Sequence, residues 1–473
     1  MSRRLARLAL ALASLGACGS PPAARPAAPQ PPVAQASVPQ ATVKPASRFT
    51  IPVEYHKLDN GLRVVLSRDP GAPTVAVGVY YHIGFRLEPR ARTGFAHLFE
   101  HMMFQGSENL GKMEFIKLVQ ANGGILNGST RFDFTNYYEI APSNTLETLL
   151  WAEADRMRGL AVTNENLTNQ KGVVSNEVRV NVLNRPYGAF PWLDMPQLAN
   201  ENWYNAHNFY GDLHDIEAAK LDEVKGFFAT YYAPNNAALA IVGDFDPPAA
   251  LALVEKYFGK IPRAEIPPLP DLTEPRQEKE KRQSKVDKLA KRPALAIAYH
   301  MPARGTPEHV AMGVLQRILA SGHDSLLYQS LVQRRGLTGD VDSAINELGN
   351  MWNYQGPMLF TISLFHDAGK TPDEILAAID EEVEKLRTSP VDAETFARAV
   401  VKMRSDTYDT LDEFVGFGKA DLLAAFALFD DDPARVNQIE DLIAKVTPEL
   451  VLATAKEYLR PGNRTILTLE AQP

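Results

Sequence analysis

The chain has 473 residues, of which 45% are hydrophobic and 22% are charged, and its formal net charge is −8. This composition is ordinary for a globular protein, and after residue 17 no apolar segment is long enough to cross a membrane. The acidic balance, without a basic stripe or an aromatic-basic motif, argues against a nucleic-acid-binding protein. Beyond residue 48 roughly 425 residues remain, which is too many for one typical core and fits two domains.

Residues 1–17 have the features of a bacterial signal peptide. Three arginines precede an apolar run from Leu8 to Leu15, which is too short to span a bilayer. The run Leu15-Gly16-Ala17-Cys18 then resembles a lipobox, the bacterial signal for attaching lipid to a cysteine. Cys18 is the only cysteine, so an intrachain disulfide is excluded and lipidation of Cys18 is expected. Gly19 and Ser20 follow in place of an aspartate, which by resemblance to Gram-negative lipoproteins predicts the outer membrane, facing the periplasm.

Residues 18–48 are predicted to be the lipidated cysteine and a tether. Between residues 19 and 48 there are eight prolines and no aromatic residue, so this segment has nothing from which to build a core. A proline-rich chain extends by about 3 Å per residue, which would place the folded part tens of ångströms from the membrane. Removal of residues 1–17 changes the formal net charge from −8 to −11.

The first elements of the folded part are predicted to be strands. Asn60-Gly61 separates residues 55–58 from residues 62–66, a pattern typical of a two-residue β-hairpin. Thr74–Tyr81 is predicted to be the next strand. Further along, residues 145–158 and 373–387 have the apolar spacing of amphipathic helices. Strands and helices are therefore mixed along the chain.

The most informative run, from Gly94 to Ser107, contains His-x-x-Glu-His, formed by His97, Glu100 and His101. In a helix the two histidines project from one face about one turn apart and can hold one zinc ion. Glu100 then lies beside them, where its carboxylate can take a proton from a water molecule. Because the glutamate precedes the second histidine, this is the inverted form of the zinc-protease signature. The alternative is an ordinary amphipathic helix whose histidines are surface or core polar residues.

A zinc site needs a third protein ligand, and the best candidate is Glu177. The segment Thr163–Arg179 is predicted to be a helix that carries on one side Leu167, Gln170, Val173, Val174 and Glu177. An unpaired carboxylate on a buried stripe is costly, and a metal would neutralise it. The alternative is a glutamate at a helix edge that bonds to solvent or to an arginine.

These residues and four further segments resemble the pitrilysin/insulinase family of zinc metalloproteases. The chain is also similar in size to one subunit of mitochondrial processing peptidase. That family carries His-x-x-Glu-His followed by a glutamate ligand at a similar distance, and here 75 residues lie between His101 and Glu177. The similarity covers roughly residues 50 to 470. The segments that carry it are Gly123–Thr130, Asp133–Tyr138, Phe227–Asn236 and Ile241–Asp244.

The resemblance implies an α+β fold of two tandem homologous domains. Each would be a largely antiparallel sheet packed with helices, and together they would form a half-shell around a cavity. The resemblance also implies that Asn127, Gly128 and Ser129 lie on an edge strand near the zinc, where an extended peptide can pair with the backbone. The alternative for this segment is a plain hairpin turn around Gly123-Gly124.

An internal repeat supports two domains. Tyr231, Pro234 and Asn236 recur 227 residues later as Tyr458, Pro461 and Asn463, and the apolar run from Val75 is matched 220 residues later by the run from Leu295. The second copy has no His-x-x-Glu-His, so one domain is expected to carry the chemistry and the other to cover it. The predicted boundaries are 49–262 for the zinc-binding peptidase domain, 263–292 for a linker and 293–473 for the non-catalytic domain.

Two positions depart from the family pattern. Many members have a second glutamate where this chain has Gln170, whose amide can hydrogen-bond near the metal but brings no charge. Relatives often have Arg-Gly-Leu-Ala-Tyr in the second domain, whereas this chain reads Arg335-Gly336-Leu337-Thr338-Gly339. The tyrosine that helps to hold substrate is therefore missing. A homodimer, or a heterodimer with a related subunit that supplies the arginine–tyrosine pair, is expected.

The sequence thus predicts a metalloendopeptidase with one Zn²⁺ per chain, held by His97, His101 and Glu177, that cleaves unfolded or flexible peptides with Glu100 as the general base. One alternative is a weakly active or non-catalytic shell subunit of a heteromeric peptidase, motivated by Gln170 and the missing tyrosine. Another is a zinc hydrolase that acts on something other than peptides. No nucleic-acid partner is expected, and contact with the membrane is expected only through the lipid.

Overall fold

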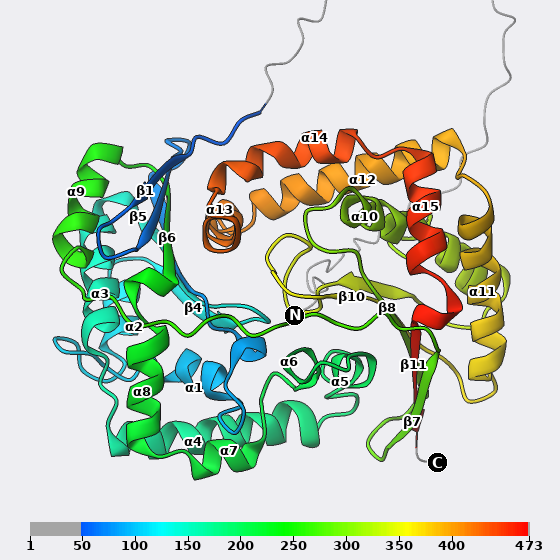
Figure 1. The fold of residues 1–473 in the computed structure, drawn as a ribbon, viewed down its shortest axis with the longest axis horizontal. Coiled ribbons are helices and arrows are strands. Elements are labelled where there is room, and N and C mark those ends of the chain that lie inside the picture. The colour runs from blue at the N-terminus through cyan, green and yellow to red at the C-terminus, as the bar shows by residue number, and fades with distance from the viewer. Residues whose placement is uncertain (1–48, 472–473) are drawn as a thin grey trace, which may run out of the picture. The chain divides into compact units, whose positions relative to one another are not determined.

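The computed structural model describes residues 49–471 (Figure 1). By its contacts the chain divides after Phe49, and the unit that begins at Thr50 is the one described below. The predicted signal peptide, Cys18 and the tether lie outside the described residues. Within residues 49–471, no helix combines the length and the apolar character that a membrane span requires.

The first sheet has six strands. In chain order they are β1 (Glu54–Lys57), β2 (Arg63–Arg68), β3 (Thr74–Tyr81), β4 (Ile125–Thr130), β5 (Thr135–Pro142) and β6 (Ala237–Gly243). Their order in space is β1-β2-β6-β3-β5-β4, and all neighbours are antiparallel except β2 and β6. β1 and β2 form the predicted hairpin, where Gly61 adopts a φ of +91° that favours glycine. The predicted strand Thr74–Tyr81 is confirmed, and so is the hairpin, but not its two-residue turn: the N–H of Leu58 donates to the carbonyl of Leu62 (3.0 Å), so residues 59–61 form a three-residue loop.

The second sheet repeats five of these strands. They are β7 (Lys281–Asp287), β8 (Ala294–His300), β9 (Asp342–Ile345), β10 (Leu359–Phe365) and β11 (Arg464–Ala471). Their order is β7-β11-β8-β10-β9, and only β7 and β11 are parallel. The short helices η4 (Pro234–Asn236) and η7 (Pro461–Asn463) lead into β6 and β11, so the sequence repeat is also a structural repeat. The predicted α+β class with largely antiparallel sheets is confirmed, while the domain boundaries at residues 262 and 292 stay a prediction.

Helices pack on the first sheet because its strands are apolar on both faces. On one face, Val75, Val77 and Val79 of β3 share a core with six helices of eight or more residues, which Figure 1 shows on the left, and the shorter helix Leu213–Ala218 adds Ile216 to this core. The six helices are α1 (Phe95–Met102), α2 (Glu114–Ala121), α3 (Leu146–Gly159), α4 (Asn164–Val178), α8 (Leu221–Tyr231) and α9 (Pro247–Phe258). Between α4 and α8 lie three short helices, α5 (Asp194–Ala199), α6 (Trp203–Ala206) and α7 (Leu213–Ala218).

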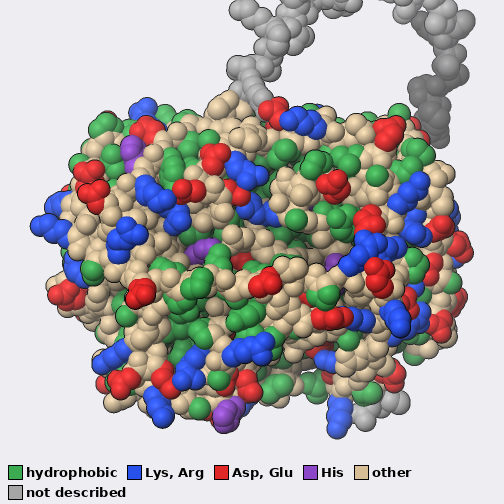
Figure 2. Space-filling model, in the orientation of Figure 1, with side chains coloured by type: hydrophobic (Ala, Val, Ile, Leu, Met, Phe, Trp, Pro, Cys, Tyr) green, Lys and Arg blue, Asp and Glu red, His purple; other side chains and the backbone are tan. Residues whose placement is uncertain are grey.

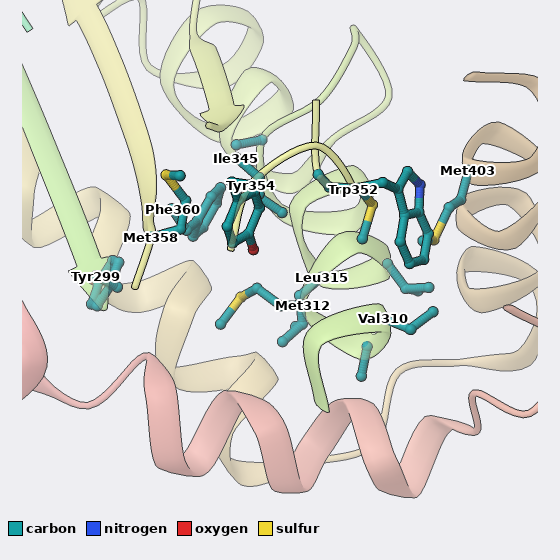
Figure 3. Close-up of a cluster of buried hydrophobic side chains, with 14 of the residues drawn as sticks. Tyr299, Val310, Met312, Leu315, Ile345, Trp352, Tyr354, Met358, Phe360 and Met403 are labelled. Atoms are coloured by element: carbon teal, nitrogen blue, oxygen red, sulfur yellow. The ribbon is translucent and has the colours of Figure 1, made fainter. Parts of the chain in front are cut away.

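Six further helices and the second sheet build the other core. They are α10 (Pro307–Leu319), α11 (Pro372–Thr388), α12 (Ala393–Leu411), α13 (Phe417–Asp430), α14 (Ile439–Ala444) and α15 (Pro448–Tyr458). Figure 3 shows Met312 and Leu315 of α10 in this core, beside the segment that carries Trp352 and Tyr354. The remaining short helical turns are η1 (Phe85–Leu87), η2 (Ser143–Thr145), η3 (Arg179–Leu183), η5 (Tyr328–Arg334) and η6 (Pro433–Gln438).

The first sheet with helices α1 to α9 is called the first half here, and the second sheet with helices α10 to α15 is called the second half. Each half contributes a helix that packs on the sheet of the other half. α13 of the second half packs on β3 and β6 of the first sheet, and α5 of the first half packs on β8 and β11. Figure 1 shows α13 beside β6. Buried polar contacts add to this packing, because the Tyr80 hydroxyl donates to Asp421 of α13 (3.0 Å) and the Gln355 N–H donates to Asp133 (2.7 Å). The two sheets therefore share one continuous interior.

Charged side chains of both signs are scattered over the face of the molecule that Figure 2 shows. On the face shown in Figure 2, lysine and arginine side chains are interspersed with aspartate and glutamate over both halves. Basic side chains therefore do not gather into a single stripe on this face.

Candidate metal centre

Helix α1 carries the two histidines, and it begins at a glycine for a steric reason. Gly94 has a φ of +82°, and a Cβ atom there would come within 2.4 Å of the carbonyl oxygen of Tyr210. From Phe95 to Met102 the helix buries its large apolar side chains in the core of the first half. His97 and His101 therefore lie on one helical face, and their Nε2 atoms are 3.3 Å apart.

Helix α4 carries the third candidate ligand. Thr163 caps this helix, since its hydroxyl accepts a 3.2 Å hydrogen bond from the N–H of Asn166. Of the predicted buried stripe, Leu167, Gln170 and Val174 are buried, and Glu177 lies at its edge with 28% of its side chain exposed. The prediction was wrong for Val173, which is 41% exposed. Around the axis of α4, Val173 and Val174 lie on opposite sides of Glu177. The side that carries Val173, about 40° from Glu177, faces solvent.

The three candidate ligands converge on one point. Oε1 of Glu177 lies 3.6 Å from Nε2 of His97, and Oε2 lies 3.2 Å from Nε2 of His101. The ligand atoms of all three residues lie within 4.8 Å of one another. A tetrahedral zinc ion with bonds of about 2.0–2.1 Å separates its ligand atoms by about 3.3 Å, so the observed spacing fits such an ion. Within residues 49–471 no second group of histidine, cysteine or carboxylate side chains comes together in this way.

The protonation states of these side chains also fit a cation. Burial lowers the pKa of His97, so its imidazole is neutral near pH 7 and has a lone pair to offer. Burial alone would raise the pKa of Glu177, but the hydrogen bond from His101 and the neighbouring imidazoles bring it below its usual value. Glu177 is therefore a carboxylate at neutral pH. A neutral imidazole and an ionised carboxylate are the forms that bind Zn²⁺.

Two aromatic residues that the sequence did not point to support this group. The Tyr210 hydroxyl donates a 3.1 Å hydrogen bond to Oε1 of Glu177, and burial raises the pKa of Tyr210, so the hydroxyl keeps its proton. The ring of Phe209 lies 4.9 Å from that of His97, centre to centre. Neither residue stands at a ligand-like spacing from His97, and Tyr210 follows Glu177 by 33 positions, so no sequence signal marks them.

The other two predicted site residues of these helices differ in their surroundings. Glu100 is half-buried on α1, and no hydrogen bond or ion pair joins it to another residue between 49 and 471. Its carboxylate is therefore open to water or substrate. Gln170 is buried two turns before Glu177, and its Nε2 donates to Asn169 (2.7 Å) rather than to a candidate ligand.

The predicted substrate segment is an edge strand. Asn127, Gly128 and Ser129 lie within β4, whose only partner strand among residues 49–471 is β5. Gly123-Gly124 connects α2 to β4, so the alternative of a hairpin turn at these glycines is wrong. α1 packs against β4, where the Thr130 hydroxyl donates to the carbonyl of Ala96 (3.4 Å). The unpaired edge of the sheet therefore runs beside the helix that carries the histidines.

The segment Arg335–Gly339 of the second half lies between η5 and β9. Arg335 forms an ion pair with Glu381 of α11. The Thr338 hydroxyl donates to the carbonyl of Phe365 (2.7 Å). Both contacts stay within the second half, so this segment has a structural role there.

Comparison with known proteins agrees with this geometry. The description "Insulinase (Peptidase family M16)" matches residues 63–190, which contain His97, Glu100, His101 and Glu177. The description "Peptidase M16 inactive domain" matches residues 218–403, which contain none of them. The chain belongs to the insulinase family, M16, of peptidases. Together the two matches cover about two thirds of its length.

Similar proteins include a bacterial zinc protease and a subunit of a mitochondrial-processing peptidase. The zinc protease PqqE of Helicobacter pylori is 25% identical over 87% of this chain and 91% of that protein. Subunit beta of the mitochondrial-processing peptidase of Bos taurus is 27% identical over 45% of this chain and 44% of that protein. The crystal structure of a protease from Helicobacter pylori has the same fold, with a TM-score of 0.82 and 24% identity over 89% of this chain and 100% of that one.

Proposed function

We propose that this M16-family protein is a zinc metalloendopeptidase with one Zn²⁺ per chain. The observation that carries the proposal is the convergence of His97, His101 and Glu177 at the spacing of a tetrahedral zinc site, with Glu100 on the same short helix as the histidines. The relative from Helicobacter pylori is named a zinc protease, which supports the same metal.

Each residue has its own task in this proposal. His97, His101 and Glu177 would hold the ion. When bound, zinc supplies a positive charge that lowers the pKa of water and polarises a carbonyl group. Glu100, whose carboxylate has no partner among the described residues, takes the proton from the attacking water and passes it to the leaving amine.

The proposed substrate is an unfolded or flexible peptide. β4 has an unpaired edge beside α1, and an extended peptide adds to such an edge through backbone hydrogen bonds along Asn127, Gly128 and Ser129. A compact folded protein has no free extended segment to offer, so it is a poor substrate. Because Gly339 stands where relatives carry a tyrosine, we propose that a second copy or a related subunit completes the substrate site.

The cellular location is a separate proposal. The signal-peptide pattern of residues 1–17 and the lipobox before Cys18 support a chain that is lipidated at Cys18 and held at the outer membrane, facing the periplasm. Mass spectrometry of the chain expressed in a Gram-negative bacterium tests this. We expect residues 1–17 to be absent and Cys18 to carry lipid, and we expect Cys18→Ser to carry none. An unprocessed parent chain would contradict the proposal.

A non-catalytic shell subunit is the second candidate function, because Gln170 brings no charge to the site and the tyrosine is missing at Gly339. The complete ligand set argues against it, since a shell needs neither the ligands nor Glu100. Metal analysis of the full-length chain in detergent separates the two. About one zinc per chain, together with peptide cleavage that Glu100→Gln abolishes, supports the peptidase. A folded chain that takes up no supplied zinc would favour the shell.

A further inference from the structure

One segment of the first half contacts both helices that carry the candidate ligands. It spans residues 203–215 and comprises α6, the connection to α7 and the first turn of α7, and is named here the support segment. α6 lies against η1, which precedes α1 in the chain, and α7 lies against α4. Figure 1 shows α7 running beside α4. The support segment therefore reaches both sides of the candidate metal centre.

At the ligand side, Tyr210 contacts two of the three candidate ligands. Its hydroxyl donates to Oε1 of Glu177 (3.1 Å), and its ring centre lies 5.0 Å from that of His97. Only 6% of Tyr210 is exposed, so packing holds its ring in place. With Oε1 held by Tyr210, the other oxygen of Glu177 points at His101, 3.2 Å away. Such hydrogen bonds orient a metal ligand before the metal arrives.

At the other side, the support segment meets the first turn of α1. Gly94 has no side chain with which to cap this helix. Instead, the buried carboxylate of Glu88 accepts hydrogen bonds from the N–H groups of Gly94 (2.7 Å) and Ala96 (2.6 Å). Its negative charge also suits the positive end of the helix. The carbonyl of Tyr210 packs so closely on Gly94 that no Cβ would fit, which ties the support segment to the start of α1.

The buried charge of Glu88 has a partner in His207 of the support segment. Nε2 of His207 lies 3.6 Å from Oε2 of Glu88 and 2.5 Å from the carbonyl oxygen of Phe85, while Nδ1 lies 3.2 Å from the carbonyl oxygen of Trp203. Both ring nitrogens therefore face oxygen atoms, one of which belongs to the buried carboxylate of Glu88. Burial raises the pKa of Glu88, and His207 opposes that rise. The pair thus favours the ionised form of Glu88, in which both oxygens accept.

We propose that Tyr210 and the Glu88–His207 pair are positioning residues of the metal centre. Tyr210 fixes the carboxylate of Glu177, and the pair fixes the start of α1 and with it the direction of His97. Because one short segment carries both Tyr210 and His207, it sets the two ligand-bearing helices relative to each other. This role rests on the proposed function, since it presumes that Zn²⁺ is the bound ion.

Tyr210→Phe tests the first contact, because it removes the hydroxyl and keeps the ring. We expect the affinity for Zn²⁺ and for Co²⁺ to fall by about tenfold. The visible absorption of bound Co²⁺, which reports coordination geometry, should change as well. Tyr257→Phe is the matched control, since it also removes a tyrosine–carboxylate hydrogen bond, to Glu147 at the surface (2.7 Å), and should bind metal as the parent does. Equal affinity and an equal Co²⁺ spectrum for Tyr210→Phe and the parent would overturn the role of Tyr210.

The variants Glu88→Gln and His207→Gln, alone and combined, test the pair. Glu88→Gln removes the charge at the start of α1, and His207→Gln removes the buried side chain that partners this charge, so we expect each change to lower Zn²⁺ affinity by about tenfold. In the double variant no charge is left unpaired, and the drop should be smaller than the product of the two single drops. The pairing would be overturned if the loss of Zn²⁺ affinity in the double variant equalled the product of the two single losses. It would also be overturned if the single variants folded and bound Zn²⁺ as tightly as the parent.

Metal titration of the parent distinguishes a failure of the proposed function from a failure of the positioning role alone. A folded parent that binds neither Zn²⁺ nor Co²⁺ overturns the proposed function, and the positioning role with it. A parent that binds both ions while all variants bind equally well overturns the positioning role alone. If a Glu88 or His207 variant does not fold, Tyr210→Phe still decides whether the support segment positions the ligands.

Discussion

Oε2 of Glu177 lies 3.2 Å from Nε2 of His101, although the two residues are 76 positions apart in the chain. The contact forms because α1 and α4 pack against each other and bury side chains in the same core. Two helices therefore supply the candidate ligands, and the distances between the ligand atoms depend on how these helices pack.

Replacing Glu177 with glutamine tests whether this carboxylate holds the metal. The amide has nearly the same shape but no charge, so we expect Zn²⁺ affinity to fall by more than about 100-fold. Titration against a competing chelator measures the change. Glu165→Gln, in the exposed first turn of the same helix, should bind zinc as the parent does. An unchanged affinity for Glu177→Gln would remove this residue from the ligand set.

Replacing Glu100 with glutamine should separate chemistry from metal binding. Without a general base, kcat for a flexible peptide is expected to fall by about 10²- to 10⁴-fold. The zinc content should stay at the parent value, because Glu100 is not a candidate ligand. Glu108→Gln is the control, since that exposed carboxylate pairs with Arg158 (3.0 Å) away from the ligands. Cleavage at the parent rate by Glu100→Gln would be incompatible with the proposed base.

Acid is expected to destabilise the second half through His309. Burial, and next the charge of Arg304, lower the pKa of this residue to about 4. Between that value and about 6.5 the unfolded chain binds a proton at this position and the folded protein does not, so stability falls as the pH decreases. From pH 7 to pH 5 this residue should reduce the free energy of unfolding by about 2 kcal/mol.

Urea unfolding at pH 7 and pH 5 measures this effect. His309→Gln should lose less stability than the parent between the two pH values, because it has no group that titrates there. His214→Gln, which alters an exposed histidine, should behave as the parent does. The same loss of stability in the parent and in His309→Gln would show that His309 does not titrate in this range.

The contact between the halves is expected to depend on Asp421. This buried carboxylate of α13 accepts hydrogen bonds from Tyr80 (3.0 Å), Asn353 (3.0 Å) and Asn350 (3.2 Å). Asp421→Ala leaves three donors without their acceptor, and two of them, Tyr80 and Asn353, are buried, so the free energy of unfolding should fall by about 3 kcal/mol. Asp409→Ala, at an exposed position of α12, should change it by less than about 0.5 kcal/mol. Similar stability of the two variants in urea unfolding would show that the network contributes little.

The local elements and half of the candidate site could be predicted from the amino-acid sequence. Thr74–Tyr81 and the hairpin at Asn60-Gly61 follow from alternation and turn chemistry within a few residues. The four-residue spacing of His97 and His101 places both on one helical face for the same reason. The predicted buried stripe of residues 163–179 made Glu177 the best candidate for the third ligand, the family resemblance supported that choice, and the structure brings Glu177 to the histidines.

The surroundings of these residues depend on tertiary packing and could not be predicted from the sequence. Tyr210, Glu88 and His207 stand at no regular spacing from the ligands, and Val173 turned out exposed where the helical pattern predicted burial. The exchange of α5 and α13 between the two sheets is likewise invisible in the local pattern. Periodicity acts over a few residues, whereas these contacts depend on the angles and distances at which whole helices pack, and those are fixed by side chains far apart in the chain.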